Sequence, residues 1–262
     1  MESVKDFLRK LKAVTLLQMA KRNYTYKELS IRLNLDIPTL NRYVNRQILP
    51  TSKRAQKIIQ ALQNLLNPSI EIVKCLFSES VEELPEADKI FTSHPELAMW
   101  IISEIFDRVS RKSFDSILTV EGGGYLFASC ISAIMGKRVV LARKRKPHGS
   151  NYIFETYYPH TLLKAGVFNP DFQRNLFLPR YLIRRKDRVI LMDDVIWTGE
   201  TMRALFKMAT RVGMNVNYGI VIAVWSKDVF ETLQKDLAIP IDYLIPLYKY
   251  RKYNKILEVQ EG

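Results

Sequence analysis

Residues 188–201 read Arg-Val-Ile-Leu-Met-Asp-Asp-Val-Ile-Trp-Thr-Gly-Glu-Thr, and this stretch decides the fold. An apolar run of strand type is followed by two adjacent carboxylates and then by a loop of small residues that opens a helix. In a parallel sheet such a loop lies at the carboxyl end of its strand, where loop amides and a helix N-terminus favour an anion such as phosphate. The stretch therefore predicts a ligand site in an α/β domain.

Strand-like and helix-like segments alternate on both sides of this stretch, which predicts a mostly parallel sheet. The expected strands are residues 116–120, 138–142, 188–192 and 216–224, with helices near 125–135 and 201–212. The apolar run at residues 70–77 is also read as a strand. Because the composition changes after Asn67-Pro68, we expect an N-terminal domain at residues 1–66, a linker at 67–95 and a second domain at 96–262.

Composition excludes several classes of protein. A hydrophobic content of 47% in 262 residues excludes disorder over most of the chain. Two cysteines and three scattered histidines exclude a disulfide framework and a local metal motif, so no metal site is expected. No apolar run reaches the length of about 18 residues that a membrane helix needs, and the expected location is the cytoplasm.

Positive charge is concentrated at the N-terminus. The chain carries a formal charge of +13, and residues 1–66 hold 13 Lys or Arg against 4 Asp or Glu. This segment has helical periodicity, with a helix from Thr25 to Leu33, a turn at residues 34–36 and a helix from Ile37 to Arg46. The spacing resembles a DNA-binding helix-turn-helix. The alternative is a helical packing or oligomerisation module with a solvated basic face.

The candidate DNA contacts share polar or basic side chains on or just after the second helix of this motif. They are Thr39, Asn41, Arg42, Asn45, Arg46, Lys53 and Arg54.

Residues 188–201 resemble the phosphoribosyl pyrophosphate (PRPP) signature of the type I phosphoribosyltransferases. The resemblance implies that Asp193 and Asp194 meet the ribose hydroxyls, and that Thr198, Gly199 and Thr201 surround the 5-phosphate. Two further residues of the expected site depart from the family pattern, because Trp197 replaces a Thr and Glu200 replaces a Gly.

Two upstream segments resemble the pyrophosphate-binding parts of the adenine and xanthine-type enzymes. The first contains Glu121, Gly122, Gly123 and Gly124, with Gly123 in place of the usual Arg, and its alternative is a tight turn. The second follows the next strand and offers Lys144 and Lys146, with a solvated basic strand end or a nucleic-acid surface as the alternative. The missing arginine argues against turnover more than against binding.

Both domains together resemble a group of archaeal regulators, analogous to the bacterial purine repressor. We therefore expect a homodimeric transcriptional regulator that binds double-stranded DNA and senses PRPP or a purine nucleotide, with or without Mg²⁺ and with no required cofactor. The alternative is an active purine phosphoribosyltransferase with an accessory nucleic-acid-binding domain. A third hypothesis is RNA binding on the same scaffold, because charge alone does not distinguish DNA from RNA.

Overall fold

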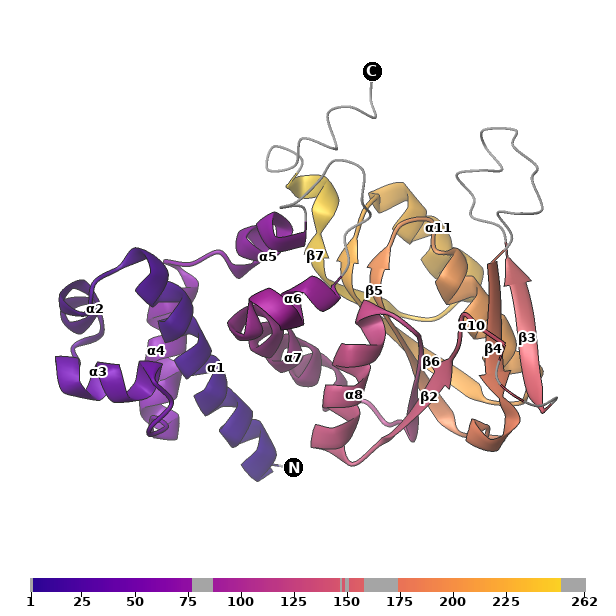
Figure 1. Cartoon of the computed structure of the whole chain (residues 1–262), viewed down its shortest axis with the longest axis horizontal. Helices are drawn as coiled ribbons and strands as arrows, with labels where there is room; N and C mark the ends of the chain where they lie inside the picture. The colour runs from indigo at the N-terminus through magenta and orange to yellow at the C-terminus, as the bar shows by residue number, and fades with distance from the viewer. Residues whose placement is uncertain (1, 77–86, 147, 149–150, 158–173, 251–262) are drawn as a thin grey trace, which may run out of the picture. The chain divides into compact units, whose positions relative to one another are not determined.

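The computed structural model describes residues 2–76, 87–146, 148, 151–157 and 174–250 (Figure 1). Contacts between residues divide the chain into two compact units. The first is helical and consists of residues 1–79 and 89–109, and the second contains the sheet and consists of residues 80–88 and 110–262.

The helical unit is built around its first helix. Its helices are α1 (Glu2–Asn23), α2 (Tyr26–Leu33), α3 (Ile37–Val44), α4 (Ser52–Gln63), α5 (Pro68–Leu76), α6 (Asp88–Ser93) and α7 (Pro95–Val109). Helix α1 contacts α3, α4 and α7, and Leu16 and Leu17 of α1 are fully buried. Burial of such apolar side chains is the main force that holds short helices together.

Side-chain caps explain where the short helices begin. Thr25 and Glu28 form a reciprocal capping box at α2, and the Asp36 carboxylate accepts a 2.8 Å hydrogen bond from the Thr39 amide at the start of α3. Asn34 ends α2 in the left-handed conformation, with φ at 50°. The expected starts of both helices are confirmed.

Two segments differ from the sequence-based expectation. Residues 70–77 were expected to form a strand, but Pro68–Leu76 is the helix α5. Ile72, Val73 and Leu76 are buried at spacings that fit one face of a helix, and Pro68 is tolerated in a first turn. Helix α7, which was expected in the second domain, contacts α1 and clusters with the helical unit.

The second unit contains a five-stranded sheet in the order β2-β1-β5-β6-β7. All neighbouring strands are parallel, which confirms the expected mostly parallel α/β fold. The strands are β1 (Ser116–Val120), β2 (Arg138–Ala142), β5 (Arg188–Ile196), β6 (Asn215–Val224) and β7 (Ile241–Pro246). Residues of β1, the central part of β5 and most of β6 are buried, as expected for a sheet with helices on both faces.

The connections run outward in two directions from the pair β1 and β5. Helix α8 (Gly123–Met135) leads from β1 to β2, whereas α10 (Glu200–Arg211) and α11 (Lys227–Leu237) lead from β5 through β6 to β7. Because such crossovers are right-handed, the two directions place α8 and the α10–α11 pair on opposite faces of the sheet (Figure 1). The direction in which successive strands are added to the sheet therefore reverses between β1 and β5, and open α/β sheets form ligand crevices at such points.

A separate antiparallel pair, β3 (Tyr152–Tyr157) and β4 (Arg174–Pro179), joins the sheet unit through α10 and β2. The 3₁₀ turns η2 (Arg180–Leu182) and η3 (Leu247–Lys249) follow β4 and β7. Among the described residues, no helix has both the length and the apolar character needed to cross a membrane.

Candidate functional site

The two sequence motifs lie side by side at the carboxyl end of the sheet. Strands β1 and β5 are paired neighbours, with Leu118 opposite Leu191. Glu121 and Gly122 follow β1 directly, and Asp193 and Asp194 lie in the last part of β5. Because parallel strands end on the same edge, the glycine loop (residues 121–124) and the acid pair (Asp193 and Asp194) lie at the same edge of the sheet.

The consecutive glycines allow the glycine loop to approach the acid pair closely. A Cβ atom added to Gly124 would lie 2.9 Å from the Cα atom of Asp193 and 3.0 Å from the amide nitrogen of Asp194. A Cβ on Gly123 would lie 2.5 Å from Oδ2 of Asp194. Gly122 has φ at 137°, which side-chain-bearing residues rarely adopt. These three positions therefore require glycine for packing and backbone reasons.

Burial and proximity raise the pKa of both carboxyl groups of the acid pair. Asp193 is 7% exposed, and its Oδ1 accepts a 3.0 Å hydrogen bond from the amide of Asp194. Desolvation raises the pKa of Asp193 well above its usual range, and the charge of Asp194 adds to this. Desolvation also raises the pKa of Asp194, while its hydrogen bond from the Val195 amide, at 2.8 Å, opposes the shift. Such a pair favours a ligand that donates hydrogen bonds, as vicinal hydroxyls do.

Lys144 connects the loop after β2 to the glycine loop. Its backbone amide donates a 3.0 Å hydrogen bond to Oε2 of Glu121. Its ammonium nitrogen lies 3.6 Å from the position that a Cβ of Gly122 would take, and its charge favours the ionised forms of Asp193 and Asp194. The ammonium of Lys146 instead lies over the ring of Tyr152, 5.6 Å from its centroid. Only Lys144 of the two lysines is thus placed at the acid pair.

The loop after β5 turns sharply into α10. Gly199 adopts the left-handed conformation, with φ at 79°, and Glu200 is the first helical residue. Trp197 packs on Trp225, which follows β6, with ring centroids 4.0 Å apart. The carboxylate of Glu200 accepts a 3.0 Å hydrogen bond from Arg203, so this acid is paired within the helix.

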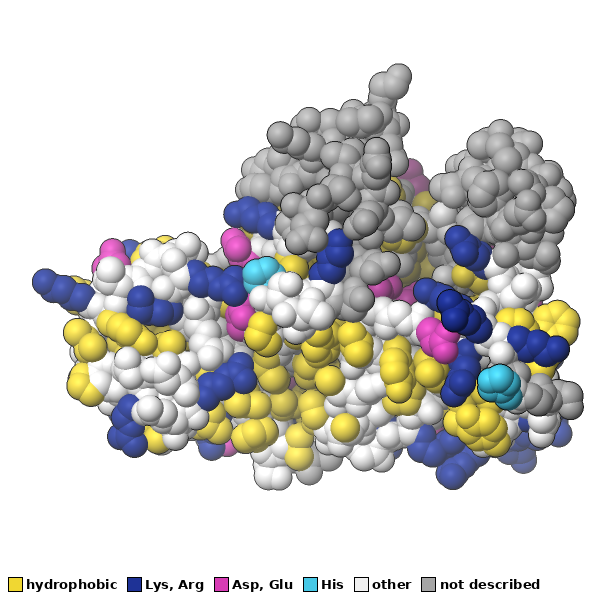
Figure 2. Space-filling view, in the orientation of Figure 1, with side chains coloured by type: hydrophobic (Ala, Val, Ile, Leu, Met, Phe, Trp, Pro, Cys, Tyr) yellow, Lys and Arg dark blue, Asp and Glu magenta, His cyan; other side chains and the backbone are white. Residues whose placement is uncertain are grey.

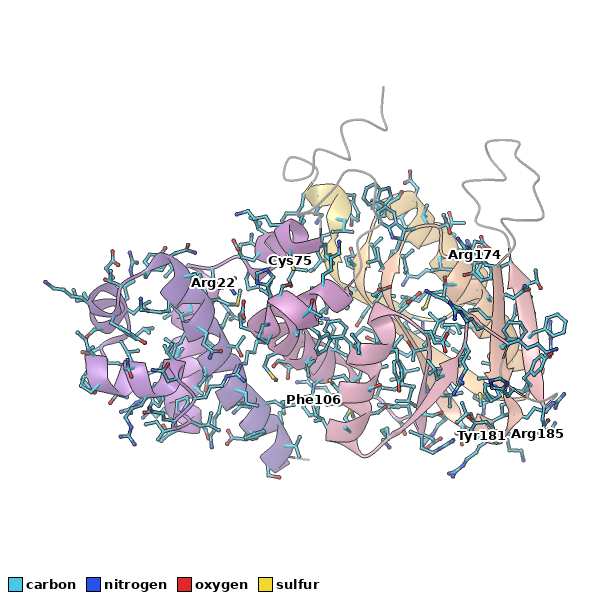
Figure 3. All side chains as sticks on the ribbon, viewed as in Figure 1. Arg22, Cys75, Phe106, Arg174, Tyr181 and Arg185 are labelled. Atoms are coloured by element: carbon cyan, nitrogen blue, oxygen red, sulfur yellow. The ribbon has the colours of Figure 1, made fainter. Side chains whose placement is uncertain are left out.

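Two further polar residues reach this loop, and sequence reasoning gave neither of them a role. Arg203 also donates a 3.0 Å hydrogen bond to the carbonyl oxygen of Thr198. Tyr157, at the end of β3, hydrogen-bonds the side chain of Thr201, and desolvation raises its pKa. Arg174, labelled in Figure 3, lies opposite Tyr157 in the register of β3 and β4. The spacing of three residues between Glu200 and Arg203 was a readable signal, whereas the position of Tyr157 depends on strand pairing.

Several residues that sequence analysis assigned to DNA contact are engaged within the helical unit. Asn45 donates to Asn41, Arg46 to Gln18 and Arg54 to the Tyr43 hydroxyl. Arg42 and Lys53 are exposed, and Thr39 is half-buried. On the visible face of the helical unit, Lys and Arg side chains are spread out and form no single patch (Figure 2).

Part of the helical unit and most of the sheet unit match a known protein family. The model of the phosphoribosyl transferase domain family matches residues 81–237, more than half of the chain. An adenine phosphoribosyltransferase of Petrotoga mobilis is 27% identical over 142 residues, which are 51% of this chain and 75% of that protein. A hypoxanthine/guanine phosphoribosyltransferase of Methanohalobium evestigatum is 26% identical over 178 residues, which are 68% of this chain and 86% of that protein.

Solved structures show the same fold. An adenine phosphoribosyltransferase of Leishmania donovani matches with a TM-score of 0.55 and 20% identity, over 70% of this chain and 80% of that chain. One from Thermoanaerobacter pseudethanolicus matches with a TM-score of 0.54 and 19% identity, over 67% of this chain and 98% of that chain.

These findings correct the expected function. The relatives and structural neighbours are purine phosphoribosyltransferases, so the prediction of a DNA-binding transcriptional regulator is wrong and the alternative, an active enzyme, is better supported. The N-terminal region is helical, but a helix-turn-helix domain is not shown. The ligand loop of residues 188–201 is common to binding and catalysis, so the expectation of a regulator depended on the basic N-terminal helices and on the substitutions at positions 123, 197 and 200. The match over residues 81–237 and the sheet topology establish that this chain belongs to the phosphoribosyl transferase domain family.

Proposed function

We propose that this protein is a purine phosphoribosyltransferase, which transfers the phosphoribosyl group of PRPP to a purine base. The observation that carries the proposal is the close approach of the glycine loop to the acid pair. A Cβ atom added at Gly124 would lie only 2.9 Å from the Cα atom of Asp193. That approach supports the proposal, because it brings a loop of phosphate-binding type next to two acceptors for hydroxyl groups. The names of the relatives support a purine as the acceptor base.

The loop after β5 is proposed to hold the ribose 5-phosphate group. Asp193 and Asp194 would accept hydrogen bonds from the two ribose hydroxyls. Thr198, Gly199 and Thr201 would surround the 5-phosphate with hydroxyls and amides at the N-terminus of α10, where the helix dipole favours an anion. Trp197 and Glu200 would border this site, with the indole packed on Trp225 and the carboxylate held by Arg203.

The glycine loop and the adjacent lysine are proposed to hold the pyrophosphate group. Amides of residues 122–124 would donate to its oxygens, because the Glu121 amide already donates to the carbonyl oxygen of Ala142, and the ammonium of Lys144 would supply a positive charge next to Gly122. Lys144 thereby takes over part of the role of the arginine that Gly123 replaces. Lys146 would contribute at longer range, because its ammonium lies over Tyr152.

The proposed reaction is a displacement at the anomeric carbon of PRPP. A purine ring nitrogen forms the new bond to that carbon, the bond from the carbon to the pyrophosphate oxygen breaks, and the electron pair leaves with pyrophosphate. The proton of the purine nitrogen passes to solvent or pyrophosphate. Positive charge develops on the ribose in the transition state, and the carboxylates of Asp193 and Asp194 near the sugar would stabilise it electrostatically.

A Mg²⁺ ion, if it accompanies PRPP, would be held mainly by the oxygens of pyrophosphate. Among the described residues no group of three or more His, Cys, Asp or Glu side chains is arranged to hold a metal. Asp193 and Asp194 offer two carboxylates, which suits a cation that arrives with the substrate and retains other oxygen ligands.

A pyrophosphate-release assay tests the proposed reaction. The full chain is mixed with PRPP, Mg²⁺ and adenine, hypoxanthine, guanine or xanthine, and with uracil as the non-purine control. We expect release of pyrophosphate and formation of the nucleotide with at least one purine and none with uracil. The double variant Asp193→Asn, Asp194→Asn is the inactive control. Binding of PRPP by calorimetry without turnover on any purine would overturn the enzymatic proposal.

We further propose that the helical unit is an accessory nucleic-acid-binding module of the enzyme. The turn between α2 and α3, with Asn34 in the left-handed conformation and Leu29 and Leu40 buried, supports this proposal. Arg42 and Lys53 would supply contacts to DNA without rearrangement, whereas the other candidates, Thr39 included, would first exchange a partner. A duplex with two half-sites would also require a homodimer.

Competition between specific and random DNA duplexes across a salt series tests this module. If the protein contacts phosphates alone, its affinity falls with salt equally for every DNA sequence. If it also contacts bases, it retains a preference for the specific duplex over the random one. We expect the variant Arg42→Gln to lower affinity and Lys5→Gln, at the far end of α1, to leave it unchanged. If both variants bind DNA with the affinity of the wild type, the proposed role of α3 is contradicted. An RNA duplex in the same assay shows whether the protein prefers DNA or RNA.

A further inference from the structure

Arg203 connects three parts of the sheet unit at the phosphate loop. Its Nη1 atom donates to the carbonyl oxygen of Thr198 and to Oε1 of Glu200, both at 3.0 Å. Its Nε and Nη2 atoms donate to Oδ2 of Asp236 on α11, at 3.0 and 2.7 Å. Because the guanidinium is planar and its donors point in fixed directions, these contacts leave it little freedom.

The contact with Thr198 fixes the orientation of the next peptide group. The structure has no cis peptide bonds among its described residues, and in a trans peptide the C=O and N–H bonds point in opposite directions. Holding the carbonyl of Thr198 on the side of Arg203 therefore directs the amide of Gly199 away from Arg203. Gly199 has a positive φ of 79°, a backbone conformation that glycine adopts without strain.

The contact with Glu200 compensates a charge at the same loop. Glu200 is the first residue of α10, where the helix dipole favours its carboxylate as it would favour a phosphate, and the two negative charges would repel each other. Arg203 pairs with that carboxylate, and the side chains of both residues are only about one-fifth exposed, 21% and 20%. Partial burial strengthens this pairing relative to a surface ion pair.

The contact with Asp236 anchors the guanidinium from outside the loop. Asp236 lies on α11 and is more exposed than the other two partners, with 46% of its side chain accessible. A Cβ on Gly199 would lie 3.2 Å from Nη1 of Arg203, so the guanidinium is packed against the loop itself. Arg203 therefore contacts the loop after β5 through Thr198 and Glu200, and its guanidinium is held in place by Asp236 of α11.

We propose that Arg203 is a positioning residue for PRPP, which directs the Gly199 amide to the 5-phosphate and keeps Glu200 from repelling it. The proposal rests on the assignment of this loop to PRPP. Position 200 tolerates a carboxylate in this chain because position 203 is an arginine. The two residues form one functional unit, and a substitution of one changes the effect of a substitution of the other.

Kinetics of Arg203→Met and Arg203→Lys test the proposal. We expect Arg203→Met to raise the KM and the dissociation constant for PRPP about tenfold, because charged hydrogen bonds are lost, and to change kcat by less than about threefold. Arg203→Lys keeps the charge but not the fork of donors, so its effect is intermediate. Arg211→Met on the same helix, whose arginine pairs with Glu155 at 2.6 Å, is the matched control and keeps the wild-type KM.

The double variant Arg203→Met, Glu200→Gln separates the two contributions. Removing the Glu200 carboxylate restores the part of the PRPP affinity that was lost through charge repulsion. The loss of affinity that remains is the contribution of the oriented Gly199 amide. Melting temperatures of all variants show whether the fold is retained. A folded Arg203→Met protein that binds PRPP within twofold of the wild type would overturn the proposal, as would an equal fall of affinity in Arg211→Met.

The binding and kinetic readouts distinguish this proposal from the enzymatic one. Wild-type protein that binds PRPP but releases no pyrophosphate overturns the enzymatic function, while the affinity of Arg203→Met still tests Arg203. Wild-type protein that binds neither PRPP nor ribose 5-phosphate overturns both.

Discussion

The backbone amide of Lys144 donates a 3.0 Å hydrogen bond to the carboxylate of Glu121, and this contact joins the loops that follow β1 and β2. The two strands are neighbours in the sheet, with Val120 opposite Ala142, so their loops leave the same edge. Glu121 thus holds the backbone of the residue whose ammonium lies beside the glycine loop. Its proposed importance is positional, because its own negative charge would not favour pyrophosphate.

Substitution of Glu121 tests this positional role. Glu121→Gln retains an acceptor for the Lys144 amide, whereas Glu121→Ala removes it. We expect the KM for PRPP to rise by roughly three- to tenfold in Glu121→Ala and to change little in Glu121→Gln, since one hydrogen bond to a charged group is lost only in the former. Steady-state kinetics with PRPP as the varied substrate measures both. An equal rise in the two variants would show that the charge matters and not the hydrogen bond.

The two lysines after β2 are expected to contribute unequally. Lys144→Met removes the ammonium next to Gly122 and should raise the KM for PRPP about tenfold, with a weaker dependence on salt than the wild type. Lys146→Met should have a smaller effect, because that ammonium lies over the Tyr152 ring. Calorimetric titration at two ionic strengths measures both variants. The reverse order of effects would contradict the proposed site.

A methyl group at position 124 is expected to separate the glycine loop from β5. In Gly124→Ala the Cβ atom would meet backbone atoms of Asp193 and Asp194 at 2.9–3.1 Å, and backbone cannot move aside as a flexible side chain can. We expect a loss of about 1–3 kcal/mol in the free energy of unfolding, as for other overpacked sites. Urea unfolding measures it. Ser129→Ala in the same helix, whose buried hydroxyl has no hydrogen-bond partner among the described residues, is the control and should cost nothing.

The acid pair is expected to make the stability of the ligand-free protein fall as pH rises. The pKa of Asp193 is raised in the folded state, chiefly by desolvation, so the folded protein retains a proton that the unfolded chain releases near pH 4. Its stabilising contribution is present below that pH and is lost as pH rises through the folded-state pKa. Asp193→Asn should therefore be more stable than the wild type at pH 7, by on the order of 1 kcal/mol, and should no longer bind PRPP.

Urea unfolding of both proteins from pH 5 to pH 8 measures this difference. The two curves should converge toward acid pH. Parallel curves would show that Asp193 carries no raised pKa.

The pair of Trp197 and Trp225 provides an optical signal at the site. The rings lie 4.0 Å apart between centroids, so a ligand that contacts Trp197 changes the environment of both indoles. We expect PRPP to change the tryptophan emission of the wild type and most of this change to disappear in Trp197→Phe. Trp100→Phe in α7, which lies in the helical unit, should retain it. A signal that survives in Trp197→Phe would place the ligand elsewhere.

Local sequence determined the elements and the main motif of this protein. The helical periodicity of residues 25–46 and the alternating apolar segments predicted two helices and a parallel sheet, because periodicity acts over a few residues. The acid pair and the loop after it were readable for the same reason, and the family match confirmed the kind of domain.

Tertiary structure alone decided the remaining features, because each depends on residues far apart in the chain. Helix α5 was mistaken for a strand, since a short apolar run has no distinctive period, and packing of α7 on α1 is a contact between distant segments. Pairing of β1 with β5 brings Gly124 to Asp193, and packing of α11 beside α10 brings Asp236 to Arg203. Spacing within one segment carries no information on such contacts, which is why Lys144 and Lys146 looked equivalent in sequence and lie in different surroundings in the fold.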